Sequence, residues 1–393
     1  MMQYKEESYV RRLWEILAVA TYLGVMSFGG PLAHLGYFHK EYVKKRKWVD
    51  EVFYADIVAL CQFLPGPASS QIGIAIGTYR GGYLGGILAW LGFTIPSVLL
   101  LVYAYYGLQE IGEEQLNFIH GLKIVAVAVI SQAVWGMGTK LAPDKKRATI
   151  VLAAAMVTLL WPAAYIQIIV LVAAGILGLF FADTVKISQG QVVAFPVSRQ
   201  AGLLLLLLLF ILLLGLPILR QIFGGEWIHV IDVFFRIGSL VFGGGHVVLP
   251  MLEKEMVPTG WVDSSQFLVG YGLAQAVPGP LFTFAAYLGV VIHGWMGAMV
   301  ATIAIFLPSF LLVWGVMPFW NQIRKQIQFQ KVLWAVNAAV VGILLAALYN
   351  PVWINSIGNS KDFAIGLLCF GLLQYWKVPP WCVVLLACFL SII

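Results

Sequence analysis

The chain reads QFLPGP at residues 62–67 and QAVPGP at residues 275–280. Both passages lie within long apolar stretches, where a proline removes a backbone hydrogen bond and the adjoining glycine weakens the helix further. Lipid cannot satisfy the backbone groups that such a break exposes, so the break is unfavourable unless it faces protein or water. The two matching motifs therefore predict two broken helices with related roles.

The sequence around the two motifs is duplicated as well, so that residues 27–106 and 241–320 are two versions of one passage. Two single-residue gaps are enough to align the copies over roughly eighty positions. The duplication predicts a fold with two related halves. The matching elements are Phe28-Gly29-Gly30 with Phe242-Gly243-Gly244, Lys40-Glu41 with Lys254-Glu255, Trp48-Val49-Asp50 with Trp261-Val262-Asp263, and Pro96-Ser97 with Pro308-Ser309.

The composition places these stretches in a membrane. Of the 393 residues, 61% are hydrophobic and only 11% are charged, and the mean hydropathy is +0.89. A transmembrane helix needs about 20 apolar residues, and segments of roughly this length recur along the whole chain. They lack the alternation of a membrane barrel, as the run from Leu203 to Leu209 illustrates. We expect an all-α integral membrane protein with about 13 transmembrane or re-entrant helices.

The duplication also divides the chain into regions. We predict an N-terminal repeat at residues 1–182, a connector with an extra transmembrane helix at 183–226, and a C-terminal repeat at 227–393. The extra crossing makes the second copy enter the membrane from the opposite side, which gives inverted-topology repeats. Basic residues in the loops favour an N-terminus inside the cell. The basic stretch 40–47 is the exception, so the side on which residues 31–53 lie stays open. Residues 31–47 could form an amphipathic or re-entrant element.

The broken helices indicate where a substrate binds. A half-helix N-terminus inside the membrane presents free N–H groups and a positive dipole, which favour an anion. Paired breaks in inverted halves predict a midplane site, and neutral donors with glycine N–H groups suit a tetrahedral oxyanion. The alternative is that the breaks are packing kinks between closely spaced helices. The residues predicted to bind substrate are Phe28, Gly29, Gly30, Gln62, Pro65, Gly66, Pro67, Ser69, Ser70, Phe242, Gly243, Gly244, His246, Gln275, Pro278, Gly279, Pro280 and Thr283.

The two copies are not chemically equal. Gly245-His246 in the second copy replaces Pro31-Leu32 in the first, and we expect the more polar first copy to supply most anion contacts. His246 could carry a proton near neutral pH, and His34 lies close to the equivalent place in the first copy. A lone histidine, however, is more often a hydrogen-bonded bystander.

Two charged dipeptides flank the predicted path. Lys40-Glu41 and Lys254-Glu255 are predicted to act as charge pairs that attract the anion and separate when a gate moves. An interfacial ion pair without such a role is the alternative.

The duplicated Phe-Gly-Gly, Trp-Val-Asp, Gln-x-x-Pro-Gly-Pro and Pro-Ser elements, in a chain of this length, resemble the long-chain, two-repeat form of the chromate ion transporter (CHR) family. The resemblance covers nearly the whole chain. It implies a multi-pass protein of the bacterial inner membrane that exports chromate, driven by the membrane potential or a proton gradient, with sulfate as a related anion. No nucleotide-binding motif is present in the sequence, as expected of a secondary transporter.

Other classes of function receive less support. The cysteines at positions 61, 369, 382 and 388 lie in apolar segments without metal-ligand spacing, so we predict no metal and no cofactor. The apolar segments contain no paired acids or Ser/Lys dyad, which argues against an enzyme. A lipid-phosphate flippase or scramblase that uses the bases at residues 44–47 is the alternative, as is a transporter of another oxyanion. The predicted partners are a chromate- or sulfate-type oxyanion and membrane lipid, but no nucleic acid. Whether the protein forms a homodimer, and which coupling ion it uses, stays open.

Overall fold

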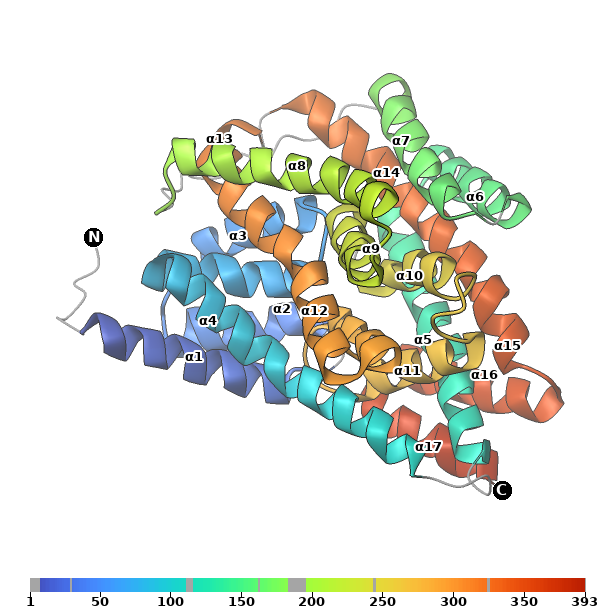
Figure 1. Cartoon of the computed structure of the whole chain (residues 1–393). Helices are drawn as coiled ribbons and strands as arrows, with labels where there is room; N and C mark the ends of the chain where they lie inside the picture. The colour runs from blue at the N-terminus through green and yellow to red at the C-terminus, as the bar shows by residue number, and fades with distance from the viewer. Residues whose placement is uncertain are drawn as a thin grey trace.

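The computed structural model describes residues 8–28, 30–110, 116–161, 163–182, 196–242, 245–323 and 326–392. Within these ranges the chain is helical and forms no β-strand, which confirms the predicted all-α fold (Figure 1). The first repeat contains α1 (Tyr9–Met26), α2 (Gly30–Phe38), the π-helix η1 (His39–Lys45), α3 (Glu51–Phe63), α4 (Ala68–Gln109), α5 (Leu116–Leu141), α6 (Lys145–Leu160) and α7 (Ala164–Phe181). The connector contributes α8 (Arg199–Phe223). The second repeat contains α9 (Glu226–Leu240), η3 (Gly245–Val247), α10 (Val248–Met256), α11 (Ser264–Ala276), η4 (Leu281–Thr283), α12 (Phe284–Val316), η5 (Met317–Phe319), α13 (Trp320–Ile323), α14 (Ile327–Ala347), η6 (Leu348–Trp353), α15 (Ile354–Ser356), α16 (Ser360–Gln374) and α17 (Pro380–Ile392).

Several of these helices are suited to a membrane. In the described part of the chain, five helices are long and apolar enough to cross a bilayer, namely Ala68–Gln109, His120–Leu141, Arg199–Phe223, Leu281–Phe319 and Ile327–Ser356. Two shorter apolar helices, Tyr165–Phe181 and Pro380–Ile392, accompany these five. Together with the hydropathy of the sequence, these helices confirm a multi-pass membrane protein, whereas the total of about 13 transmembrane or re-entrant helices stays a prediction.

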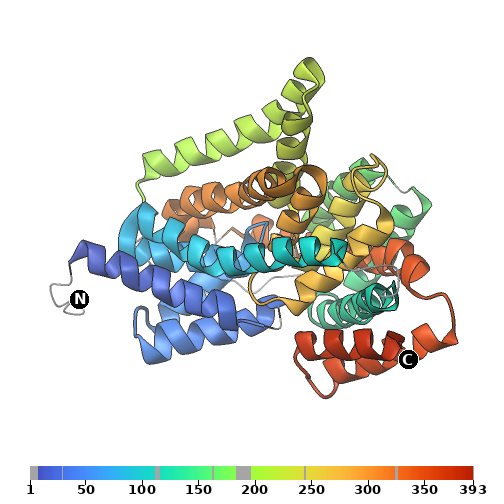
Figure 2. The same ribbon diagram turned by 60° about the horizontal axis from the view of Figure 1, so that its bottom comes forward.

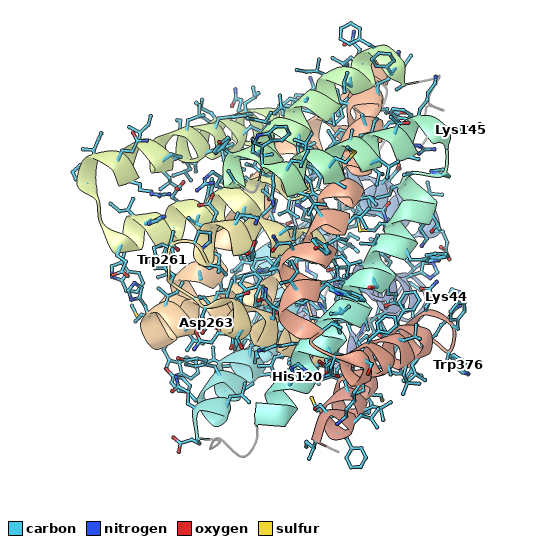
Figure 3. The ribbon with its side chains drawn as sticks, turned by 90° about the vertical axis from the view of Figure 1, so that its right-hand side faces the viewer. Lys44, His120, Lys145, Trp261, Asp263 and Trp376 are labelled. Atoms are coloured by element: carbon cyan, nitrogen blue, oxygen red, sulfur yellow. The ribbon has the colours of Figure 1, made fainter. Side chains whose placement is uncertain are left out.

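The duplicated motifs set the ends of two short helices. The carboxylate of Asp50 accepts a hydrogen bond from the Phe53 N–H at 2.8 Å, and so caps the start of α3. Asp263 caps α11 in the same way, and Figure 3 shows it with Trp261 at the turn before that helix. Both helices end just before their Pro-Gly-Pro motif after 13 residues. A helix of this length rises about 20 Å, so each one crosses only part of a bilayer.

The long helices α4 and α12 are each two helices joined by a sharp turn. Gly82 has φ +66° and Gly294 has φ +59°, values that favour glycine. The two halves of α4 run antiparallel, as the contact between Gly77 and Gly85 shows. A Cβ at Gly77 would overlap the carbonyl oxygen of Gly85, which lies eight positions further along the chain. The corresponding glycines of α12 approach each other in the same way. Each Pro-Gly-Pro motif is therefore followed by a short half-helix that folds back along a full-length helix.

The two repeats exchange helical hairpins. The α6–α7 hairpin of the first repeat packs on α14 of the second, and the α16–α17 hairpin of the second packs on α5 of the first (Figure 1). A reciprocal exchange is the arrangement that a pseudo-two-fold axis between the repeats produces. Helices of each repeat are therefore buried partly by helices of the other repeat.

The connector helix α8 lies along the outer edge of the molecule (Figure 2). It packs on α9 and α12, but only 17% of its most apolar window is buried. Leu203, Leu204 and Leu207 are among its exposed side chains. A helix that is so apolar and so exposed is suited to face lipid, as predicted for the extra transmembrane helix. Residues 183–195 of the predicted connector lie outside the described residues.

Candidate functional site

The Pro-Gly-Pro loops connect the two repeats through their backbones. The Gly66 N–H donates to the carbonyl oxygen of Val241 at 2.6 Å, and the Gly279 N–H donates to that of Ser27 at 2.9 Å. Ser27 and Val241 occupy equivalent positions, each directly before a Phe-Gly-Gly motif. Gly66 has φ +112° and Gly279 has φ +98°, so both loops depend on glycine. The loop of each repeat is thus bound to the other repeat.

Two equivalent serines lie against the same glycines. A Cβ at Gly66 would lie 3.1 Å from Ser309 Oγ, and a Cβ at Gly279 would overlap Ser97 Oγ. Both serines are fully buried, and neither hydroxyl has a hydrogen-bond partner among the described residues. Again the serine of one repeat contacts the loop of the other. Each loop therefore faces a buried hydroxyl that has no hydrogen-bond partner in the described structure.

Further polar atoms near the loops also lack partners within the described part of the chain. Leaving a buried polar group unsatisfied costs about 1–3 kcal/mol, so a ligand or water that completed several of these hydrogen bonds would be stabilised there. Near the Gly66 loop they are Ser70 Oγ and Gln71 Oε1, and on the elements that meet at the Gly279 loop they are Ser27 Oγ, His34 Nδ1, Thr94 Oγ1 and Gln275 Nε2.

The predicted donors of the first Pro-Gly-Pro motif divide between interior and surface. Pro67, Ser69 and Ser70 are buried at the start of α4, whereas Gln62 is exposed at the end of α3. Gln71, a further neutral donor beside this motif in the sequence, donates from Nε2 to the Pro65 carbonyl at 2.6 Å and so closes the loop. The structure brings the serines to the loop but leaves Gln62 outside it.

Two polar residues predicted to bind substrate in the second copy already have hydrogen-bond partners. Thr283 is buried, and its hydroxyl donates to the Pro280 carbonyl at 2.7 Å, within its own loop. His246 Nδ1 lies 2.8 Å from the Tyr271 hydroxyl. Phe242 is half-buried and Pro278 is buried. Thr283 and His246 therefore already have partners, whereas Gln275 Nε2 has none among the described residues.

The Phe-Gly-Gly motifs are described only in part. Gly30 begins α2, and the ring of Phe28 lies 6.2 Å from that of Trp381 on α17. Gly29, Gly243 and Gly244 lie outside the described residues.

The acids of the two predicted charge pairs have other partners. Glu41 contacts Arg46 at 2.7 Å and Lys45 at 3.3 Å, while Lys40 is exposed. Burial raises the pKa of Glu41, but its hydrogen bonds with Arg46 and Lys45 outweigh this and hold the pKa below its ordinary value.

In the second copy, too, the acid of the predicted pair contacts a different base. Glu255 pairs with Arg236 at 2.6 Å, and Lys254 lies 3.5 Å from Glu253. In both copies the acid is thus bound to a base other than its sequence neighbour.

The basic stretch 40–47 is anchored through one of its residues. Arg46 reaches Glu15 on α1 at 2.9 Å, and Glu15 also pairs with Arg80, whose guanidinium lies 4.5 Å from the centre of the Trp48 ring. Lys44, in contrast, is exposed, as Figure 3 shows. The bases of this stretch therefore divide into one structural group and several surface groups.

Apart from Gln71, five residues of these clusters were not among the predicted substrate-binding residues. The match between Pro96-Ser97 and Pro308-Ser309 was visible in the sequence and could have nominated both serines. No sequence signal placed Ser27, Thr94 or His34 beside the loop of the other repeat.

Comparison with known proteins identifies the family. A model of the family described as chromate transporter matches residues 14–179 and 228–392. The chain belongs to the chromate transporter family. The two matched regions correspond to the two repeats, which leaves α8 between them. The protein is therefore a membrane transporter rather than an enzyme, and a multi-pass protein of the bacterial membrane.

Individual relatives agree with this assignment. The chain is 28% identical to the probable chromate transport protein of Synechococcus elongatus over 91% of this chain and 88% of the relative. It is 27% identical to the chromate transport protein of Pseudomonas aeruginosa over 90% of this chain and 85% of the relative. An uncharacterized transporter of Bacillus subtilis is 30% identical over 38% of this chain and 79% of its own length. One repeat thus corresponds to most of a separate, shorter protein. No solved structure matches the chain.

Proposed function

We propose that this protein exports chromate from the bacterial cytoplasm as a secondary transporter, and that sulfate is a related substrate. Membership of the chromate transporter family supports the substrate class. Export is favoured because a membrane potential that is negative inside drives anions outward by about 2.3 kcal/mol per charge per 100 mV.

The anion binds at the two Pro-Gly-Pro loops. The observation that carries this proposal is the exchanged arrangement, in which Ser97 and Ser309, both fully buried and without partners in the described chain, face the loop of the other repeat. A tetrahedral oxyanion accepts hydrogen bonds but donates none in its fully ionised form, so it matches a site of hydroxyl and backbone N–H donors. The N-terminus of α4, which begins at Ala68, adds its dipole.

Transport proceeds by alternating access. Each loop contacts the opposite repeat, so a rocking motion of one repeat against the other changes both contacts together. The exchanged hairpins couple the outer helices to the same motion, because α6 and α7 pack on α14. The near-equivalence of the two loops lets one open while the other closes.

Uptake of labelled chromate and sulfate into proteoliposomes tests this function. The purified protein should give saturable flux that depends on an imposed potential, with each anion inhibiting the flux of the other. Variants with both serines replaced, Ser97→Ala with Ser309→Ala, should lose most of this flux while remaining folded. Gradient-dependent flux that is the same in the double variant would remove the serines from the site.

A second candidate is the movement of a lipid phosphate headgroup. The observation that favours it is the exposure of Lys44 in η1 and of Lys47 just after η1, because such bases attract anionic lipid. Headgroup movement in the same liposomes, without flux of chromate or sulfate, would support this alternative over the oxyanion transporter.

A further inference from the structure

One titratable side chain near the Gly279 loop has an apolar counterpart in the second repeat. His34 binds the same Ser27 carbonyl oxygen as the Gly279 N–H, and the equivalent position in the second repeat is Val248. Both residues are almost completely buried. We infer that His34 binds a proton together with the oxyanion at the Gly279 loop, so that the substrate crosses the membrane with one proton. This inference rests on the proposed function and concerns how transport is coupled.

The hydrogen bonds around His34 fix which ring nitrogen is available. His34 Nε2 lies 3.1 Å from the carbonyl oxygen of Ser27, and a carbonyl oxygen only accepts, so Nε2 carries the hydrogen. The same oxygen accepts the hydrogen bond from the Gly279 N–H. The histidine is thereby bound to the loop of the other repeat through one shared acceptor. In the neutral ring Nδ1 is then left with a lone pair.

His34 Nδ1 is buried and has no hydrogen-bond partner among the described residues. The ring of Phe93 stands perpendicular to the imidazole at 5.5 Å, and that of Phe38 lies at 6.3 Å on another side. A Cβ at Gly279 would lie 3.3 Å from the Phe93 carbonyl oxygen and would overlap Ser97 Oγ. The histidine, the loop and the serine are therefore parts of one polar cluster that spans both repeats.

The physical argument for coupling follows from this environment. A proton added at Nδ1 creates a buried charge and a donor without an acceptor, which is unfavourable by itself. None of the contacts that the structure gives His34 in the described chain involves a charged group. An oxyanion at the loop supplies the opposite charge nearby. Binding of the anion and binding of the proton therefore strengthen each other, and by thermodynamic linkage the effect is reciprocal.

The inference has a consequence for the charge that is moved. A dianion that travels with one proton carries a single net negative charge. A membrane potential that is negative inside still drives this complex outward. His34 has Val248 as its counterpart, and His246 of the second repeat already has the Tyr271 hydroxyl as a partner at Nδ1, so one proton accompanies each anion rather than two.

The test measures accumulation of sulfate in proteoliposomes that are more alkaline inside than outside, with the potential held at zero by potassium and valinomycin. The full-length wild-type protein should concentrate sulfate about tenfold per pH unit, as expected for one proton per anion. The variant His34→Gln keeps a donor for the Ser27 carbonyl but does not titrate. It should equilibrate sulfate across the membrane without concentrating it. His39→Gln is the matched control, since His39 pairs with Glu51 at the surface, and it should behave as the wild type.

A binding measurement covers the case in which His34→Gln transports poorly. Calorimetry of sulfate binding in buffers of different ionisation enthalpy should show uptake of about one proton per anion in the wild type and none in His34→Gln. Accumulation by His34→Gln equal to that of the wild type, or equal proton uptake on binding, would overturn the inference. The absence of any sulfate or chromate flux in the wild-type protein would instead overturn the proposed function.

Discussion

The Gly66 loop and the Gly279 loop are equivalent in sequence and in backbone contacts, but not in what surrounds them. The Gly279 loop meets Ser97 and the Ser27 carbonyl, which His34 also binds. The Gly66 loop meets Ser309 and the Val241 carbonyl, and the position equivalent to His34 is Val248. The first repeat, which is the more polar copy, therefore contributes its side chains to the loop of the second. The side chains that determine which groups one loop can bind therefore come from the other repeat.

The largest effect is expected from adding a methyl group to the loop glycines. Gly279→Ala forces a φ of +98° on a side chain and overlaps Ser97 Oγ, so it should abolish sulfate flux and destabilise the protein by about 1–3 kcal/mol. Gly66→Ala should be milder, because its nearest neighbour is the end of the flexible Gln71 side chain at 2.8 Å. Flux and thermal unfolding in detergent measure both effects.

The control for the loop glycines is Gly73→Ala. Gly73 lies in α4 with nothing within 4 Å of an added Cβ, so the change should leave flux intact and stability equal or slightly higher. Equal flux in the Gly66 and Gly279 variants would show that the two loops do not differ as proposed.

Substitution of the two serines should weaken anion binding without lowering the stability of the protein. Their hydroxyls are buried without partners in the described structure, so Ser97→Ala and Ser309→Ala should leave thermal stability unchanged or slightly raised. A donor lost from the bound anion costs about 1.4 kcal/mol, which corresponds to a KM for sulfate about tenfold higher. We expect the larger increase for Ser97→Ala, whose loop also has His34. A loss of stability with an unchanged KM would indicate that the serines have only a structural role.

The N-caps test the equivalence of the repeats at a site away from the loops. Asp50→Ala and Asp263→Ala each remove one capping hydrogen bond and should destabilise the protein by about 1 kcal/mol. Because the two caps have the same geometry, the two variants should lower the unfolding temperature by the same amount. Asp50→Ser and Asp263→Ser retain a capping oxygen and should recover most of the loss. A marked difference between the two alanine variants would show that the equivalence does not extend to the helix starts.

Local features were predictable because they follow from adjacent residues. Trp-Val-Asp starts α3 and α11, Pro-Gly-Pro ends them, and the glycine-containing turns at residues 81–82 and 293–294 separate apolar segments. The exchange between repeats was not predictable, because two copies of one motif offer the same local surface to either partner. Only the packing of the complete chain decides which loop meets which serine.

The charge pairs illustrate the same limit on a smaller scale. The sequence paired Lys40 with Glu41, but on a helix the closest neighbours on one face are three or four positions apart. Lys45 lies four positions after Glu41, and the wider turn of the π-helix η1 also brings Arg46 to it, five positions away. An α-helix predicted for this stretch would have indicated Lys45 as a partner of Glu41. The π-helix that also brings Arg46 to Glu41 has no marker in the sequence.

The smallest effect is expected from the pH dependence of this ion pair. Hydrogen bonds from Arg46 and Lys45 hold the folded-state pKa of Glu41 below that of the unfolded chain, so the pair stabilises the protein above the unfolded pKa. The contribution is lost as the pH falls through the folded pKa. Glu41→Gln should therefore lower the unfolding temperature at pH 7, and its difference from the wild type should shrink as the solution is acidified below about pH 4. If the difference is the same at pH 7 and at low pH, packing of the side chain rather than its charge stabilises this element, and the basic stretch is held by Arg46 and Glu15 alone.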